Sequence, residues 1–203
     1  TMERGFLKRR FAIDSKVQEV VGCGVDLPPY LDPSPSASTS AAHDDEPPTA
    51  TSDENDSENS ATASSSRQAA VFRRRHRLYG PFALYGGRID AGKGCEELIE
   101  YFSIYAKQQG DATLALMGVK LMQIPEEPFI RFAGMLPEIE RLEALDAATV
   151  VVVPSPYESL SLLALESLAV GTPILVNARS AVLTDHCQRS NAGLYYGDKA
   201  EFV

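Results

Sequence analysis

A glycine-rich stretch near the middle of the chain carries residues suited to holding phosphate. Residues 86–94 read GGRIDAGKG and place two cations, Arg88 and Lys93, between glycines. Glycine lets the backbone approach an anion closely, and cations held in place stabilise the negative charge that grows as a bond to phosphate breaks. The stretch therefore predicts a phosphate site, the alternative being a plain glycine-rich turn with two exposed cations.

The same stretch also fits most of a P-loop, the phosphate loop of many nucleotide hydrolases. Residues 87–93 match G-x-x-x-x-G-K, but the pattern needs Ser or Thr next, whose hydroxyl binds magnesium, and the chain has Gly94 there. No strand pattern ends in the acid that would hold the metal from the other side. A P-loop-like NTPase is kept only as an alternative.

Two carboxylates downstream have a spacing that also suits a binding site. Glu158 follows a strand pattern and a proline-rich turn, and Glu166 lies eight positions later in a helical pattern. The helix neighbours of Glu166, three and four positions away, are all apolar: Leu162, Leu163, Ala169 and Val170. Glu166 is therefore not on an ordinary solvent-facing stripe. Either it pairs with a group at the ligand-facing end of the helix, or the edge of the helix is exposed to water there.

Alternating strand and helix patterns would position these residues. Strands are predicted at residues 82–86, 113–118, 129–134, 149–154 and 173–177. Helices are predicted between most of them, with Pro137 at one start and Gly110 and Gly171 just beyond two ends, as capping geometry requires. The run Val150–Val153 lacks polar alternation, which indicates a strand covered on both faces. The pattern predicts an α/β fold with a doubly wound, mostly parallel, Rossmann-like sheet, whose ligands bind beyond the carboxyl ends of the strands.

In sequence order, four motifs resemble the C-terminal donor-binding lobe of the GT-B fold retaining glycosyltransferases of the group 1 or family 4 type. They are GGRIDAGKG, RFAGML at 131–136, the E-x7-E spacing of Glu158 and Glu166 after a Pro-Ser pair, and GTPILVNA at 171–178. The similarity runs from about Phe82 to Tyr196. It implies a nucleotide-diphosphate sugar as donor and transfer of a hexosyl group to an acceptor with retention of anomeric configuration.

The resemblance also implies catalytic roles for the residues that match. Arg88 and Lys93, beside Gly87, would neutralise the leaving diphosphate. Glu158 would lie by the transferred sugar and position it by its hydroxyls. Because the two cations would carry the charge, no metal and no cofactor are expected.

The helix after Glu158 would complete the donor site. Backbone N–H groups near Ser161 and Leu162 would bind a phosphate at the helix N-terminus, and Glu166 would accept hydrogen bonds from the ribose hydroxyls. Family members commonly have glycine at the positions of Ser159 and Ser161, so this chain departs from the pattern where backbone approaches the sugar and the phosphate. The resemblance leaves the sugar and the base unassigned.

Composition divides the chain into three zones. Residues 1–30 are interpreted as a remnant of the N-terminal lobe or an interdomain connector, 31–77 as a disordered acidic Ser/Pro-rich linker with a basic end, and 78–203 as the donor-binding lobe, truncated at its C-terminus. The net charge of −9 is lopsided, because eight acids and no Lys or Arg lie between Asp32 and Ser66, and the rest of the chain carries −1. The acidic balance therefore says nothing about partners of the folded part.

Partners and location are predicted from the same features. The basic run Phe72–Arg77 is interpreted as a solvated linker edge, with peripheral contact to an anionic membrane surface as the alternative, and no nucleic acid is expected. Three widely spaced cysteines and the lack of an apolar run of about 18 residues predict a cytoplasmic protein, with the inner face of a membrane as the further option. The expected partners are a nucleotide sugar and an acceptor sugar or lipid held by a separate N-terminal lobe.

Two further interpretations complete the sequence reading. A non-catalytic nucleotide-sugar or protein-binding module, with the acidic segment recruiting partners, is the alternative function from another class. Arg141 lies close to Glu138 and Glu143 in a helical pattern, and it is predicted to pair with them on the helix surface.

Overall fold

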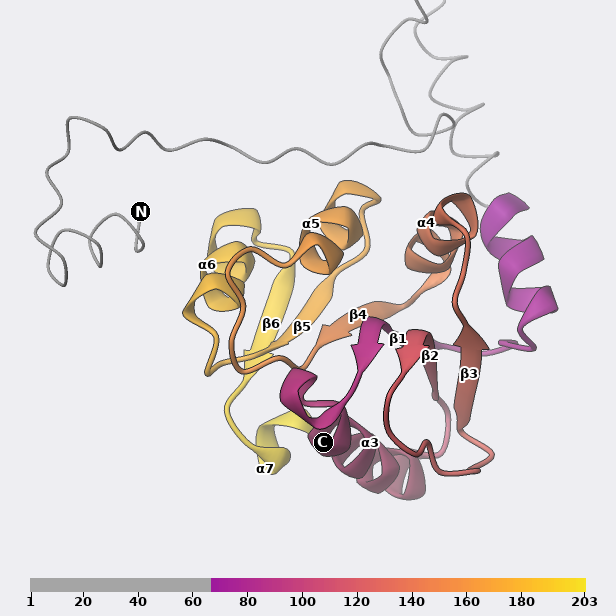
Figure 1. The fold of residues 1–203 in the computed structure, drawn as a ribbon, viewed down its shortest axis with the longest axis horizontal. Helices are drawn as coiled ribbons and strands as arrows, with labels where there is room; N and C mark the ends of the chain where they lie inside the picture. The colour runs from indigo at the N-terminus through magenta and orange to yellow at the C-terminus, as the bar shows by residue number, and fades with distance from the viewer. Residues whose placement is uncertain (1–66) are drawn as a thin grey trace, which may run out of the picture.

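A single parallel sheet organises the part of the chain that the computed structural model describes, residues 67–203 (Figure 1). The predictions for residues 1–30 and for the acidic stretch up to residue 66 lie outside this part. The strands follow the order β3-β2-β1-β4-β5-β6, and every neighbouring pair is parallel. They are β1 (Phe82–Ile89), β2 (Thr113–Lys120), β3 (Ile130–Gly134), β4 (Val150–Val153), β5 (Ile174–Asn177) and β6 (Gly193–Tyr196). The predicted α/β class and parallel sheet are confirmed.

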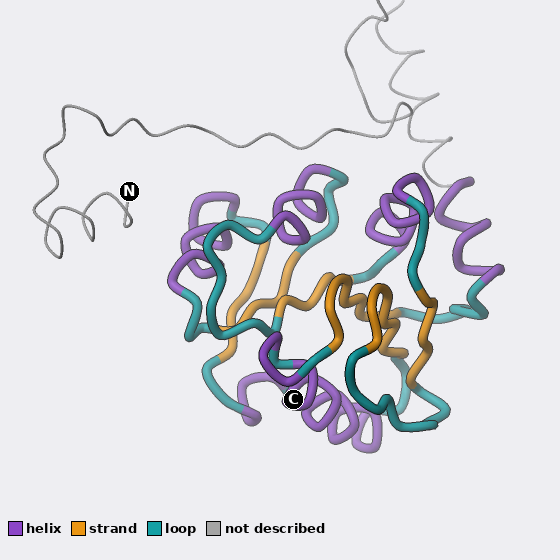
Figure 2. Tube along the Cα trace, in the orientation of Figure 1, coloured by secondary structure: helices purple, strands orange, loops and turns teal. Residues whose placement is uncertain are grey.

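Helices cover both faces of the sheet, as the tube in Figure 2 also shows. One face carries the helix over residues 67–75 with α4 (Glu138–Ala147), α5 (Leu162–Ala169) and α6 (Ala181–Ser190), and the other carries α3 (Cys95–Gln109) and α7 (Lys199–Phe202). A short 3-10 helix, η2 (Ala91–Lys93), connects β1 to α3. No helix among the described residues is long and apolar enough to span a membrane.

The central strand β4 explains why the sheet has helices on both sides. Val151 and Val153 pack into the core under α4, α5 and α6, while Val152 packs into the core under α3. All three are buried, and a strand that is apolar on both faces is stable only when both are covered. The prediction made from the unbroken valine run is confirmed.

Strand order locates the place where a ligand would bind. β1 pairs with β2 on one edge and with β4 on the other. The chain therefore adds β2 and β3 to one side of β1 and then β4, β5 and β6 to the other, so the strand order reverses at β1 and β4. In open parallel sheets this reversal leaves a crevice beyond the carboxyl ends of the two strands. The segments that follow β1 and β4 contain Lys93 and Glu158, so the topology brings them to one edge.

The basic run at residues 72–77 differs from its prediction, because it belongs to the folded domain. Phe72 in the helix over residues 67–75 is fully buried, and Leu78 just after it is buried too. Arg73 donates hydrogen bonds to the backbone carbonyls of Gly80 and Ala147. The folded part therefore includes residues 67–77, which composition assigned to the linker. Two apolar anchors among many arginines are enough to dock a short helix, and they barely change the local composition.

Candidate active site

The predicted phosphate stretch lies at the carboxyl end of β1, the central strand. β1 runs to Ile89, three residues beyond the predicted strand, so Gly87 and Arg88 are strand residues paired with Gly118 and Val119 of β2. The hydroxyl of Tyr85 donates to the backbone carbonyl of Arg88 at 2.8 Å. Burial raises the pKa of this Tyr85 hydroxyl, so it stays protonated and keeps its role as donor. The hydroxyl of Tyr85 thus fixes the backbone that carries Arg88.

Asp90 organises the turn between the two predicted phosphate-binding cations. Its side chain caps η2 by accepting a hydrogen bond from the backbone N–H of Lys93 at 2.9 Å, and it forms an ion pair with Nε of Arg88. The hydrogen bond from Arg88 is the main reason why the pKa of Asp90 lies below its ordinary value, so the carboxylate is ionised. The side chain of Arg88 is therefore oriented by a neighbouring carboxylate.

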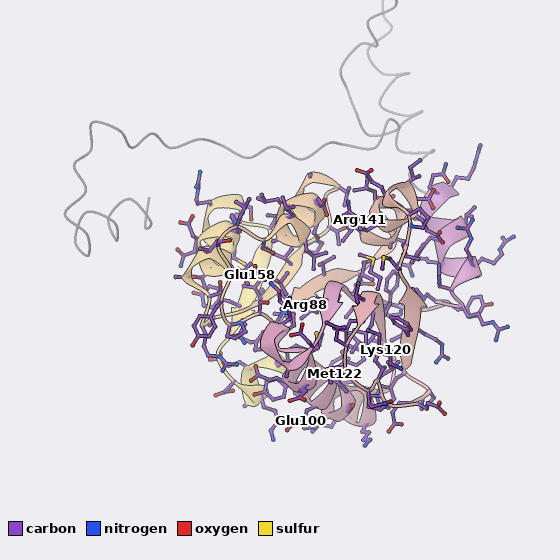
Figure 3. The ribbon with its side chains drawn as sticks, in the orientation of Figure 1. Arg88, Glu100, Lys120, Met122, Arg141 and Glu158 are labelled. Atoms are coloured by element: carbon purple, nitrogen blue, oxygen red, sulfur yellow. The ribbon has the colours of Figure 1, made fainter. Side chains whose placement is uncertain are left out.

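Lys93 reaches across to the segment that follows β4. Its Nζ lies 2.7 Å from Oε1 of Glu158, and the two side chains are 32% and 14% exposed. The two residues are 65 positions apart in the chain and meet because β1 and β4 are neighbours. Figure 3 labels Glu158 together with Arg88 and Arg141, which come from three different segments of the lobe. The structure thus brings Lys93 and Glu158 together, as the site prediction requires.

Gly94 has a geometry that argues against the P-loop alternative. It adopts a left-handed conformation with φ of 75° as the residue between η2 and α3. A Cβ added there would lie 2.5 Å from the carbonyl oxygen of Pro154. The position therefore excludes the Ser or Thr that a P-loop uses to bind magnesium.

An open cavity of about 480 Å³ lies beside this loop, between β1, β2, α4 and α5. Three charged side chains line it: Arg88, Arg141 and Glu166. Its apolar lining comes from Met117, Val119, Met135, Leu136, Leu162 and Leu163. Gly86, Gly87 and Gly118 complete it. A mostly apolar concave surface with a few charged groups is typical of a small-molecule site.

Two glycines shape the floor of this cavity. Gly118 has φ of 119°, and a Cβ on it would lie 2.0 Å from the backbone oxygen of Gly87. Any larger residue at position 118 would force the ends of β1 and β2 apart. Gly87, which was predicted as a substrate-binding residue, lines the cavity next to Arg88.

Glu166 pairs with a partner that the sequence analysis assigned elsewhere. Arg141 on α4 forms an ion pair through Nη1 with Oε2 of Glu166 on α5, and the side chains are 31% and 14% exposed. The predicted surface pairing of Arg141 with Glu138 and Glu143 is wrong, because α4 turns this side chain toward α5 and the cavity. Of the two possibilities left open for Glu166, pairing at the ligand-facing end of its helix is the one observed.

The start of α5 carries a serine in a backbone conformation that favours glycine. Ser161 is the N-cap of α5 with φ of 65°, a left-handed conformation that favours glycine. Its hydroxyl accepts weakly from the N–H of Ala164 at 3.4 Å. Leu162 follows as the first helical residue, 54% exposed and lining the cavity. Ser161 therefore holds a left-handed backbone conformation that is strained for a residue with a side chain.

The predicted site residues thus fall into two adjoining groups. Gly87, Arg88, Leu162 and Glu166 line one cavity, while Lys93 and Glu158 form an ion pair of their own. Ser161 belongs to neither group and is the N-cap of α5, next to Leu162. Sequence reasoning missed Asp90 and the inward direction of Arg141. Asp90 had a detectable signal, since an Asp three residues before the N–H it caps is a common helix start. Among residues 67–203, no three His, Cys, Asp or Glu side chains gather as a metal site would require.

The sheet order and the charged cavity at its carboxyl edge define a Rossmann-like α/β lobe. Residues 80–203 match the family described as glycosyl transferases group 1, and because this match covers more than half of the chain, the chain belongs to that family. The described domain is the C-terminal lobe of the GT-B fold, as the resemblance predicted.

Two curated relatives share part of their length with this chain. It is 32% identical over 113 residues to glycogen synthase from Mycobacterium tuberculosis (strain CDC 1551 / Oshkosh), which covers 51% of this chain and 27% of the relative. It is 28% identical over 123 residues to mannosylfructose-phosphate synthase from Agrobacterium fabrum (strain C58 / ATCC 33970), which covers 52% of this chain and 27% of the relative. The matched region thus spans about a quarter of the length of these relatives.

Solved structures resemble the lobe as well. Sucrose-phosphate synthase from Thermosynechococcus elongatus superposes with a TM-score of 0.52 at 28% identity, covering 65% of this chain and 37% of that chain. WaaG, a glycosyltransferase involved in lipopolysaccharide biosynthesis, superposes with a TM-score of 0.53 at 15% identity, covering 66% of this chain and 40% of that chain. The similarity to WaaG concerns the fold alone.

Proposed function

We propose that this lobe binds a nucleotide-diphosphate sugar and that its enzyme transfers the hexosyl group to an acceptor with retention of configuration. The observation that carries the proposal is the meeting of Lys93 and Glu158 beside the cavity that Arg88 and Glu166 line. Two cations, two carboxylates and an apolar wall are the groups needed for a diphosphate, a ribose and a base. Family membership makes the enzyme a glycosyltransferase, and the donor and the stereochemistry belong to the proposal.

The diphosphate would lie between Arg88 and Lys93. In the structure both cations are paired, Arg88 with Asp90 and Lys93 with Glu158. A diphosphate that binds here would replace these carboxylates in at least some of their contacts with Arg88 and Lys93. The cations would then stabilise the charge that grows on the leaving group as the glycosidic bond breaks, which is where preorganised charge accelerates a reaction. We propose that the donor needs no metal, because these side chains supply the positive charge.

The N-terminus of α5 would add backbone donors for the phosphate. Ser161 and Leu162 stand where the helix begins, and the positive end of the helix dipole favours an anion. The base and the ribose would then enter the cavity of about 480 Å³, with Glu166 accepting hydrogen bonds from the ribose hydroxyls. Glu158, on the loop before α5, would face the sugar and position it for transfer.

The acceptor is proposed to be a hydroxyl of a sugar or lipid presented by a separate lobe. The relatives found by comparison are synthases of glycogen, mannosylfructose phosphate and sucrose phosphate. Sugars and sugar phosphates are therefore the first acceptors to test. Proton NMR of the isolated product tests retention. The coupling constant of its anomeric proton should indicate the same anomeric configuration as in the donor.

Calorimetric titration tests donor binding directly. UDP, GDP and ADP should each be titrated into the protein, and at least one is expected to bind with a dissociation constant in the micromolar to millimolar range typical of substrates. The matching nucleotide sugar should compete for the same site. Flat traces with all three nucleotides at millimolar concentration would refute the proposal.

A further inference from the structure

The ion pair between Arg141 and Glu166 joins two helices at the wall of the cavity. Arg141 belongs to α4 and Glu166 to α5, and both side chains line the cavity in which the nucleotide is proposed to bind. We infer that Arg141 is a positioning residue for ribose recognition, which holds the Glu166 carboxylate so that its remaining lone pairs face the bound nucleoside. The inference rests on the proposed function.

The surroundings of Glu166 explain why its carboxylate needs a partner. Its side chain is only 14% exposed. Leu162 and Leu163 of its own helix and Met135 and Leu136 before α4 line the same cavity. A carboxylate in such surroundings is costly unless it is paired and hydrogen-bonded. Arg141 supplies that pairing, since no other cation forms an ion pair with Glu166 among the described residues.

The arrangement of the pair leaves room for a ligand. Nη1 of Arg141 binds Oε2 of Glu166, and Oε1 makes no hydrogen bond with any group within residues 67–203. A carboxylate has about four lone-pair positions, so one guanidinium contact leaves most of them for other donors. Two neighbouring ribose hydroxyls are donors of the right kind and spacing for a carboxylate. Arg141 therefore fixes one oxygen and leaves the other for the ligand.

The backbone of Arg141 is itself held in place by the contacts of α4. Its N–H donates to the carbonyl of Pro137 at 2.9 Å, which closes the first turn of α4. The preceding residue, Glu140, is bound by Arg75 at 2.6 Å and by His76 at 3.0 Å. The following residue, Leu142, is buried in the core. Arg141 thus projects from a helix that is fixed through the residues on either side of it in the chain, as a positioning role requires.

The opposite role for Arg141 makes a different prediction. If the guanidinium competed with ribose for Glu166, removing it would tighten nucleotide binding. The carboxylate has free acceptor positions while the ion pair is intact, and its burial makes an unpaired state expensive. We therefore expect removal of Arg141 to weaken binding.

The test separates the ribose from the phosphates. Five proteins are titrated by calorimetry: wild type, Arg141→Met, Arg141→Lys, Glu166→Gln, and the double variant Arg141→Met with Glu166→Gln. Each is titrated with whichever of UDP, GDP and ADP the wild type binds most tightly, and separately with inorganic pyrophosphate, which has no ribose. Methionine keeps most of the apolar volume of arginine and removes its donors. Urea unfolding of each variant monitors the fold.

The expected results identify a role that acts through Glu166. Arg141→Met should weaken nucleotide binding about tenfold, as for the loss of one charged hydrogen bond, with Arg141→Lys recovering part of it. Pyrophosphate affinity should change by less than about twofold in both variants. In the Glu166→Gln background, Arg141→Met should cause no more than about a twofold further loss, because the group it positions is already altered.

Each contrary result has a distinct meaning. Unchanged or tighter nucleotide binding by Arg141→Met would overturn the positioning role while leaving the donor site intact. Equal losses for nucleotide and pyrophosphate would show that the substitution damages the lobe in general, and this too would overturn it. If Glu166→Gln binds nucleotide like the wild type, the ribose role of Glu166 fails and the inference fails with it. If the wild type binds no nucleotide at all, the proposed function itself is refuted.

Discussion

Nζ of Lys93 and Oε1 of Glu158 lie 2.7 Å apart, so the cation proposed for the diphosphate and the carboxylate proposed for the sugar neutralise each other. The pair is partly buried, with Glu158 only 14% exposed. A donor would need to separate them, at least in part, to use both. The two side chains therefore already lie together at the site, and each occupies the charge of the other. Removing the charge of Lys93 should weaken phosphate binding, and removing the charge of Glu158 should strengthen it.

Replacing Lys93 by alanine should weaken diphosphate binding by about 1 to 3 kcal/mol, the range for losing a charged hydrogen bond. The loss should be seen for pyrophosphate as well as for the nucleotide, because Lys93 is assigned to the phosphates. Calorimetry measures both. Lys107→Ala is the matched control, since Lys107 is exposed in the last turn of α3. Unchanged affinity in Lys93→Ala would remove this lysine from the site.

Replacing Glu158 by glutamine should have the opposite effect on pyrophosphate. The substitution removes the charge that competes for Lys93 and keeps the size of the side chain. Because a partly exposed ion pair contributes about 0.2 to 1 kcal/mol, pyrophosphate should bind about 1.4- to fivefold more tightly at low ionic strength. The difference should shrink as salt is added. Weaker binding would instead mean that Glu158 is needed to hold Lys93 in position.

Replacing Gly94 by serine, the residue type that a P-loop has at this position, should destabilise the domain. The new Cβ would lie 2.5 Å from the carbonyl oxygen of Pro154, and the backbone has φ of 75°. Left-handed strain and overpacking together predict a loss of about 2 to 4 kcal/mol in the free energy of unfolding, measured in urea.

Gly171→Ser is the control for the strain alone. Gly171 has φ of 83°, but nothing lies within 4 Å of a Cβ placed there. Gly171→Ser should lower the free energy of unfolding only by the backbone strain, about 1 to 2 kcal/mol. Equal losses at the two positions would contradict the proposed clash of residue 94 with Pro154.

Replacing Phe72 by alanine tests whether the helix over residues 67–75 belongs to the domain. Its ring is fully buried, 4.5 Å from the ring of His76 and 6.5 Å from that of Phe82 between centroids. Deleting such a ring should lower the free energy of unfolding by about 3 to 5 kcal/mol. Val71→Ala on the same helix, 44% exposed, should change it by less than about 0.5 kcal/mol. Similar small effects of Phe72→Ala and Val71→Ala would show that this helix is not part of the folded unit.

The contact between this helix and α4 should weaken in acid. The hydrogen bonds from Arg75 first and His76 second hold the pKa of Glu140 below its ordinary value of 4.5. A carboxyl whose pKa is lowered by folding contributes stability that is complete above the unfolded pKa and is lost as the pH falls through the folded pKa. The stability difference between wild type and Glu140→Gln should therefore be constant near neutral pH and shrink below about pH 4.5.

Urea unfolding across this pH range measures the effect on Glu140. Glu126→Gln is a suitable control, because Glu126 is exposed in the loop after β2. Its difference from the wild type should change little over the same range. A Glu140→Gln difference that persists unchanged to pH 3 would show that the contact does not depend on the ionised carboxylate.

The sequence by itself determined five of the six strands of the sheet, together with α3, α4 and α5. Strand and helix patterns are local, because backbone hydrogen bonding and apolar periodicity are set within a few residues. For that reason the unbroken run Val150–Val153, the helix starting after Pro137 and the ends before Gly110 and Gly171 agree with the structure. The charged residues of GGRIDAGKG lie at the carboxyl edge of the sheet, as the alternation of strands and helices predicted.

Only the tertiary structure decided which charged groups meet. Lys93 contacts Glu158 across 65 positions because β1 lies beside β4, and Arg141 contacts Glu166 across 25 because α4 lies beside α5. A local reading paired Arg141 with near neighbours on its own helix, since helical spacing says nothing of what lies opposite. The helix over residues 67–75 was missed for the same reason: its stability comes from the burial of Phe72 against a distant part of the chain. Contacts between elements depend on strand order and layer packing, which local composition does not encode.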